Sequence, residues 1–230
     1  MASTTTSRAV RRTPRLVPRG ALGVLCGVLL AVMTTACSAP QFTYVTNSAD
    51  HTYFKVPHGW HEINQSSLSR EVSIGSQSGS WSVAYDDATA PSAAHLFADA
   101  TGRPFAWALV ENLTSAQRNS ISYDGLRNFI LPVTSSARQS ATSQSGGFAL
   151  THFQSLSDTV LTPGQGIRGV RVIYDYQYPD GTVETFDQVA YMNANASQVY
   201  VLFMHCTDVC YAQDEGQIDT IMKSFTVRSH

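Results

Sequence analysis

Residues 170–206 read VRVIYDYQYPDGTVETFDQVAYMNANASQVYVLFMHC, and this stretch decides the fold of the chain. Two turn sequences divide it, Pro179-Asp180-Gly181-Thr182 and Asn193-Ala194-Asn195-Ala196-Ser197. Because such turns join antiparallel strands, we predict three strands in series, at about Val170–Tyr178, Val183–Met192 and Gln198–Cys206. Apolar side chains occupy both sets of alternating positions in the third strand, which predicts a sheet that is covered on both faces.

Further strands and helices are expected around this sheet. Short strands are predicted within Thr52–Trp60, Ser80–Tyr85 and Phe148–Phe153, a loop at Gly164–Gly169, and a further loop-like stretch at Ser122–Ser145. From Pro91 to about Asn128 apolar residues recur at helical spacing, namely Ala94, Phe97, Ala98, Phe105, Leu109 and Leu113. A last helix is predicted from an N-cap at Asp214, with an apolar face formed by Ile218, Ile221, Met222 and Phe225. We therefore predict one α+β domain over residues 52–230, an antiparallel β-sheet sandwiched by helices, with a helical insertion at about 91–144.

The first 36 residues have the organisation of an export signal. An apolar run from Ala21 to Met33 is preceded by five arginines, Arg8, Arg11, Arg12, Arg15 and Arg19, and is followed by small residues. This order of basic, apolar and small-residue regions is typical of a secretory signal peptide. The apolar run is about 13 residues long, whereas a membrane-spanning helix needs about 20. We therefore predict that the signal peptide, residues 1–36, is removed after export.

Cys37 directly follows this segment, between Ala36 and Ser38, and the arrangement resembles the lipobox of bacterial lipoproteins. In that family the cysteine is acylated, with palmitate-type chains, and becomes the first residue of the mature protein. Thr34 stands where a leucine is usual, and an ordinary signal-peptidase cut after Ala36 would give a secreted protein instead. An uncleaved anchor is the third alternative. We predict a lipoprotein on the outer face of the cell membrane, with residues 37–51 as a tether.

The cysteine count agrees with lipidation of Cys37. Cys26 leaves with the signal, so the mature chain keeps Cys37, Cys206 and Cys210. Two exported cysteines four residues apart can close a small disulfide loop, and we predict this bond between Cys206 and Cys210. A thioredoxin-type pair would have two intervening residues, and a zinc site would need two further ligands that are not nearby in the sequence.

The exported part is acidic. Five of the 15 basic residues lie in the signal and all 17 acidic residues follow Cys37, so 10 cations face 17 anions and the net charge is −7. A domain of this charge without a cluster of lysine or arginine is not expected to bind nucleic acid or anionic lipid head groups. His58 and His61 lie near Glu62, but Gln65 occupies the position of the second histidine of a His-Glu-x-x-His zinc motif, and we predict no metal site.

The two ends of the predicted domain carry a family resemblance. Residues 53–60, YFKVPHGW, are similar to the opening strand, proline and Gly-Trp of PsbP-like domains, and residues 218–225, IDTIMKSF, resemble their closing helix. Actinobacterial lipoproteins of the LpqN type combine an export signal, a cysteine and one such domain. The resemblance implies an antiparallel sheet sandwiched by helices, and a binding or accessory role without catalytic residues. We predict no cofactor, because no cofactor motif is present.

Two groups of aromatic residues are candidates for a ligand or partner surface. Tyr174, Tyr176 and Tyr178 alternate along one strand, where they can form a wall for an apolar ligand or pack beneath a helix. In the segment 103–132 four more aromatic residues are predicted to be exposed: Phe105, Trp107, Tyr123 and Phe129. An insertion over the sheet can cover a pocket or present a partner surface.

Three hypotheses about function fit these observations. The first is an accessory or scaffold lipoprotein that binds an unknown envelope protein, and the second is a carrier that encloses a lipid or another hydrophobic small molecule beside the three tyrosines. The third is a hydrolase, which would require His152 or His205 to approach a serine and a carboxylate in space. Because no catalytic or cofactor motif is present, we predict a protein that is not an enzyme.

Overall fold

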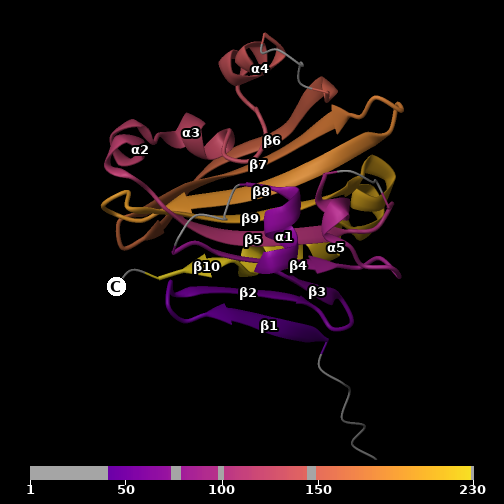
Figure 1. Cartoon of the computed structure of the whole chain (residues 1–230), viewed down its shortest axis with the longest axis horizontal. Helices are drawn as coiled ribbons and strands as arrows, with labels where there is room; N and C mark the ends of the chain where they lie inside the picture. Colours follow the sequence, from indigo (N-terminus) through magenta and orange to yellow (C-terminus); the bar gives the residue numbers. More distant parts are fainter. Residues whose placement is uncertain (1–40, 74–78, 98–100, 144–148, 229–230) are drawn as a thin grey trace, which may run out of the picture. The chain divides into compact units, whose positions relative to one another are not determined.

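The core of the fold is a seven-stranded antiparallel sheet. Figure 1 shows the strands of this sheet in the computed structural model. The structure describes residues 41–73, 79–97, 101–143 and 149–228, so Cys37 and the predicted export segment lie outside the described residues. In order across the sheet the strands are β3 (His61–Asn64), β4 (Trp81–Asp86), β5 (Phe105–Asn112), β9 (Gln198–Thr207), β8 (Val183–Met192), β7 (Ile167–Gln177) and β6 (Thr151–Gly164).

The three strands predicted from residues 170–206 are β7, β8 and β9, and they pair in series as expected. Side chains on both faces of β9 are buried from Val199 to Cys206, which confirms a sheet covered on both sides. The turn between β6 and β7 is tighter than the predicted loop at Gly164–Gly169. Gln165 and Gly166 both have positive φ angles, of 54° and 75°, as a two-residue hairpin of this kind requires.

The helical insertion predicted at 91–144 is wrong at its centre, because Phe105–Asn112 forms strand β5 in the middle of the sheet. Phe105, Leu109 and Leu113 are four residues apart, and this spacing places residues on one face of a strand as well as on one face of a helix. The seven residues from Phe105 to Glu111 are buried, on both faces of the strand. The apolar residues that we interpreted as one face of a helix therefore belong to a strand that is buried on both faces.

Short helices flank β5, including two in the stretch predicted as a loop at 122–145. They are α1 (Gln65–Glu71), the 3₁₀ turn η1 (Ala93–Leu96), α2 (Ser115–Ser120), α3 (Tyr123–Arg127) and α4 (Ser135–Thr142). Serine, threonine or asparagine caps each of them by accepting a hydrogen bond from a first-turn amide. Two of these caps, Ser122 and Thr134, lie in the stretch that we predicted as loop-like.

The last helix, α5 (Asp208–Ser224), begins six residues before the predicted N-cap at Asp214. Thr207 caps it by accepting a hydrogen bond from the amide of Cys210 at 3.3 Å, and Asp208 lies in the first turn, where a negative charge is favourable. Cys206 and Cys210 form a disulfide that joins the end of β9 to this turn.

A second, three-stranded sheet includes part of the predicted tether. Residues Phe42–Asn47 form β1, which pairs with β2 (Thr52–Pro57), and β10 (Thr226–Val227) pairs with the other edge of β2. The tether prediction for 37–51 is therefore wrong for 42–47, whose sequence FTYVTN is rich in residues that favour strands.

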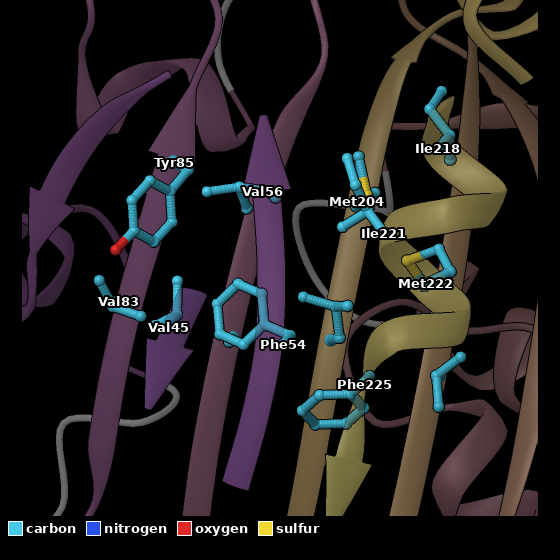
Figure 2. Packing of buried hydrophobic residues seen from close by; sticks show 14 of the residues in the cluster. Val45, Phe54, Val56, Val83, Tyr85, Met204, Ile218, Ile221, Met222 and Phe225 are labelled. Carbon is cyan, nitrogen blue, oxygen red and sulfur yellow. The ribbon is translucent and has the colours of Figure 1, made fainter. Parts of the chain in front are cut away.

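The elements form three layers, since the large sheet is covered on both faces. On one face, apolar side chains of β1, β2, β4 and β9 meet those of α5, as Figure 2 shows for Phe54, Met204, Ile221 and Phe225. On the other face, α1, η1 and α3 contribute Leu68, Leu96 and Leu126 to a second core. The α+β sandwich predicted from the sequence is therefore the observed architecture.

Candidate functional site

The aromatic residues predicted to be exposed between 103 and 132 belong to the interior or its margin. Phe105 and Trp107 lie on β5, and the Trp107 side chain is 0% exposed, with its indole Nε1 donating a hydrogen bond to Ser82 Oγ at 2.7 Å. Tyr123 and Phe129 are half-buried and pack against the second core. Phe105 and Trp107 therefore cannot form a partner surface, because they are parts of the packed centre.

Tyr174 and Tyr176 of β7 lie on one face together with Tyr178, which directly follows the strand, but most of the space beside them is filled. Tyr174 and Tyr176 are buried, and their rings lie 5.8 and 5.3 Å from Phe153. Burial raises the pKa of Tyr176 to about 12, although the nearby Arg138 cation acts in the opposite direction. Tyr178 is half-buried. A pocket of about 340 Å³ reaches Tyr176, whereas the other two tyrosines do not line it.

The histidines of the hydrolase hypothesis have different surroundings. His205 Nδ1 lies 2.7 Å from Glu184 Oε1, and both side chains are buried. The His205 ring lies 5.6–5.9 Å from the rings of Phe105, Phe186 and Phe203. Its Nε2 has no hydrogen-bond partner among the described residues, so the serine that a triad requires is not beside it. His152 Nδ1 lies 3.0 Å from Thr151 Oγ1. In the part of the chain that the structure describes, no three His, Cys, Asp or Glu side chains are grouped to hold a metal.

The edge strand β6 of the large sheet is mostly exposed. Twelve of its 14 residues are exposed, and β7 is its one neighbour in the sheet that the described strands form. Two apolar side chains of this strand, Leu156 and Val160, are 47% and 49% exposed. A long edge strand with exposed apolar side chains offers unpaired backbone groups to another chain.

A groove runs between β6 and α5 on the α5 face of the sheet. It has a volume of about 330 Å³, and its lining is Ser157, Thr159, Leu161, Arg171, Ile173, Val189, Tyr191, Met222 and Lys223. Gly169 pairs with Tyr191 of the groove lining and leaves room for the Tyr191 ring, because a Cβ on Gly169 would be 2.4 Å from Tyr191 Cδ1. We call this the α5–β6 groove.

A buried ionic network holds α5 beside this groove. Arg171 donates two hydrogen bonds to Asp187, at 3.0 and 2.7 Å, and a third to Asp219 of α5 at 2.8 Å. Tyr211 of α5 donates to Asp187 at 2.9 Å. Burial raises the pKa of Asp187, and the hydrogen bonds from Arg171 and Tyr211 oppose that rise. Lys223 and Arg171 lower the pKa of Asp219. Arg171 and Lys223 of the groove are therefore already paired with carboxylates, and most of its remaining surface is apolar.

Comparison with known structures identifies the architecture. The chain resembles cyanobacterial PsbP (CyanoP) from Synechocystis with a TM-score of 0.52 and 13% identity, over 84% of this chain and 96% of that one. The fold is PsbP-like. Weaker similarities, with TM-scores of 0.42 and 0.43, link this PsbP-like domain to LpqN of Mycobacterium tuberculosis, described as involved in cell envelope biogenesis, and to the Ran-binding protein Mog1p of Saccharomyces cerevisiae.

LpqN is 16% identical to this chain and matches 82% of it and 91% of its own length. Mog1p is 10% identical and matches 81% of this chain and 95% of its own length. No family model and no curated protein sequence matches the chain. Within the described residues, no helix is long and apolar enough to span a membrane. The similarity therefore establishes the fold, and the function has to be argued from the surfaces of this molecule.

Proposed function

We propose that this protein is an exported accessory lipoprotein of the bacterial cell envelope, and that it binds an extended apolar segment of another protein along β6. The observation that carries the proposal is the exposed edge of β6 beside the apolar α5–β6 groove. Addition of a strand to a sheet edge uses backbone hydrogen bonds for affinity and side-chain pockets for selectivity.

The middle of β6 has the geometry that strand addition requires. The ladder between β6 and β7 shifts register near Thr151, Ser155 and Leu161, but it is regular from Ser157 to Leu161. In this regular stretch Ser157, Thr159 and Leu161 face the groove, since their side chains line it. Alternate side chains of an added strand would therefore point into the groove, while the others would follow Val160 on the opposite face.

The charge of β6 also favours a partner. Exposed edge strands are commonly protected by lysines or inward-pointing charges. β6 has neither lysine nor arginine, and its one acidic residue, Asp158, is neutralised by Arg127 of α3 through hydrogen bonds of 2.7 and 2.9 Å. An apolar, uncharged strand would meet no repulsion along this edge.

A photo-crosslinking experiment tests this surface. A benzophenone amino acid at Thr159 is expected to give one discrete product with an envelope protein in the host cell, and the crosslinked peptide should be an apolar segment. Val160→Lys should abolish that product, because a lysine places a charge on the edge that the partner must cover. Both variants should keep their stability within about 0.5 kcal/mol, since these side chains are exposed.

Val209 provides the matched control, because it is an exposed apolar residue on the first turn of α5 outside the groove. The benzophenone at Val209 should give no such product, and Val209→Lys should leave crosslinking from Thr159 unchanged. Equal products from both positions, or a Thr159 product that survives Val160→Lys, would disprove binding along β6.

The anchor is tested by Cys37→Ala. We expect the exported protein to move from the membrane fraction to the soluble fraction, because one thioether-linked lipid group is its proposed attachment. Cys26→Ala, in the predicted signal, is the control and should leave the protein in the membrane. Membrane retention of Cys37→Ala would contradict the anchor. It would not bear on binding along β6, which the crosslinking experiment tests separately.

A further inference from the structure

A second hollow lies on the opposite face of the sheet from the α5–β6 groove, between α4 and the beginning of β6. Its volume is about 340 Å³, and its lining is Arg138, Gln139, Thr142, Leu150, Thr151, His152, Phe153 and Tyr176. Leu150, Phe153 and Tyr176 give it an apolar floor. This volume lies at the lower end of the range of about 300–1,000 Å³ for small-molecule sites, so a ligand here must be small.

Arg138 supplies a positive charge that no acid of the described residues neutralises. Its guanidinium lies over the Phe153 ring, 3.9 Å from the centroid, and donates a hydrogen bond to the Val133 carbonyl. Arg103, Arg127 and Arg171, by contrast, each pair with an aspartate. None of the described residues that line the pocket carries a carboxylate. A half-buried guanidinium with remaining donors beside an apolar floor is suited to a ligand carboxylate.

The backbone at the pocket is strained. His152 has a φ of 52°, in the left-handed region that residues with a side chain rarely adopt. It lies in the register shift between Thr151 and Gln154, and the side chains of Thr151 and His152 contact each other at 3.0 Å. Bulges and strained residues of this kind recur next to binding sites, where they redirect side chains. Here the irregular stretch contains both His152, a polar residue of the pocket lining, and Phe153 of its apolar floor.

We infer that this pocket binds a small carboxylic acid with an aromatic body. The carboxylate would accept hydrogen bonds from Arg138, and the ring would lie against Leu150, Phe153 and Tyr176, whose apolar and aromatic surfaces favour such contact. The inference is independent of the proposed binding along β6, because it concerns the other face of the sheet and needs no partner protein.

Three molecules of the same size and different charge test the inference. The full chain carrying Cys37→Ala would be titrated with 3-phenylpropionate, 3-phenylpropanol and 3-phenylpropylamine, and binding followed by NMR. The acid should bind at least about tenfold more tightly than the alcohol, because a charge-assisted hydrogen bond distinguishes them, and the amine should not bind. Arg138→Gln should remove this preference by weakening the acid about tenfold, while the alcohol keeps its affinity.

Two variants separate the pocket from other effects. Arg118→Gln, at an arginine of α2 that bonds Ser115, is the matched control and should change nothing. Thr142→Trp fills the pocket from an exposed helix position and should weaken acid and alcohol together, with the fold verified by its amide spectrum. Val160→Lys should leave acid binding intact. Equal binding of acid and alcohol, an Arg138→Gln variant that retains the preference, or full competition by inorganic phosphate would overturn the inference.

Discussion

Arg171→Met is expected to destabilise the domain by about 3–5 kcal/mol at pH 7, because it leaves the Asp187 carboxylate buried without its cation. The Asp187 side chain is 0% exposed, and two of its hydrogen bonds come from Arg171. Total stabilities of domains are about 5–15 kcal/mol, so this loss is a large share of the whole. Urea unfolding followed by circular dichroism measures it.

Arg127→Met is the matched control for Arg171→Met. Each arginine side chain is 17% exposed and binds two aspartates, but the partners of Arg127 are 40% and 72% exposed while Asp187 is fully buried. Water can therefore solvate the carboxylates that Arg127 leaves, and the cost should be about 0–1 kcal/mol. Equal losses in the two variants would contradict the importance of burial.

Two further measurements identify the unpaired charge as the cause. The triple variant Arg171→Met, Asp187→Leu, Tyr211→Phe removes the buried polar set and should recover most of the lost stability. The penalty of Arg171→Met should also shrink as the pH falls from 7 towards about 4.5. Burial raises the pKa of Asp187 above its unfolded value of about 3.9. As the pH falls, the folded variant therefore binds a proton before the unfolded chain does. That proton stabilises the folded state, and the stabilisation is lost as the pH rises.

The fold could be predicted where turns and strands have separate sequence signals. The turn after Tyr178 and the one after Met192 fix β7, β8 and β9, and the lengths of these strands agree with the prediction within a few residues. β5 could not be assigned in this way, because Phe105 and Leu109 satisfy a helix and a doubly covered strand equally well. Knowledge of what covers each face was required to distinguish them.

The candidate surfaces depend on contacts between distant parts of the chain. The α5–β6 groove brings Leu161 of β6 together with Met222 of α5, and neither residue is distinguished by its local sequence. β6 itself was predicted for only its first residues, because most of its side chains are exposed and polar, so it lacks the alternation of apolar and polar residues that marks a half-buried strand. Its low charge and its three threonines were the available signals.

Trp107→Ala is expected to cost about 3–5 kcal/mol, the range observed when a large aromatic side chain is removed from a core. The indole is 0% exposed on the central strand β5, with the ring of Phe97 6.5 Å away edge to face. Its removal also leaves Ser82 Oγ without the indole donor. Urea unfolding followed by circular dichroism would give the loss, because that signal does not depend on a single tryptophan.

Tyr44→Ala is the control, since the Tyr44 side chain is 77% exposed and its removal should change stability by less than about 0.5 kcal/mol. Trp107→Ala also tests whether this segment is a partner surface, as its aromatic residues suggested. At a temperature where the variant is still folded, crosslinking from Thr159 should persist, because β5 is separated from β6 by β9, β8 and β7. Loss of the crosslink in a variant that is still folded would contradict the assignment of the partner to β6.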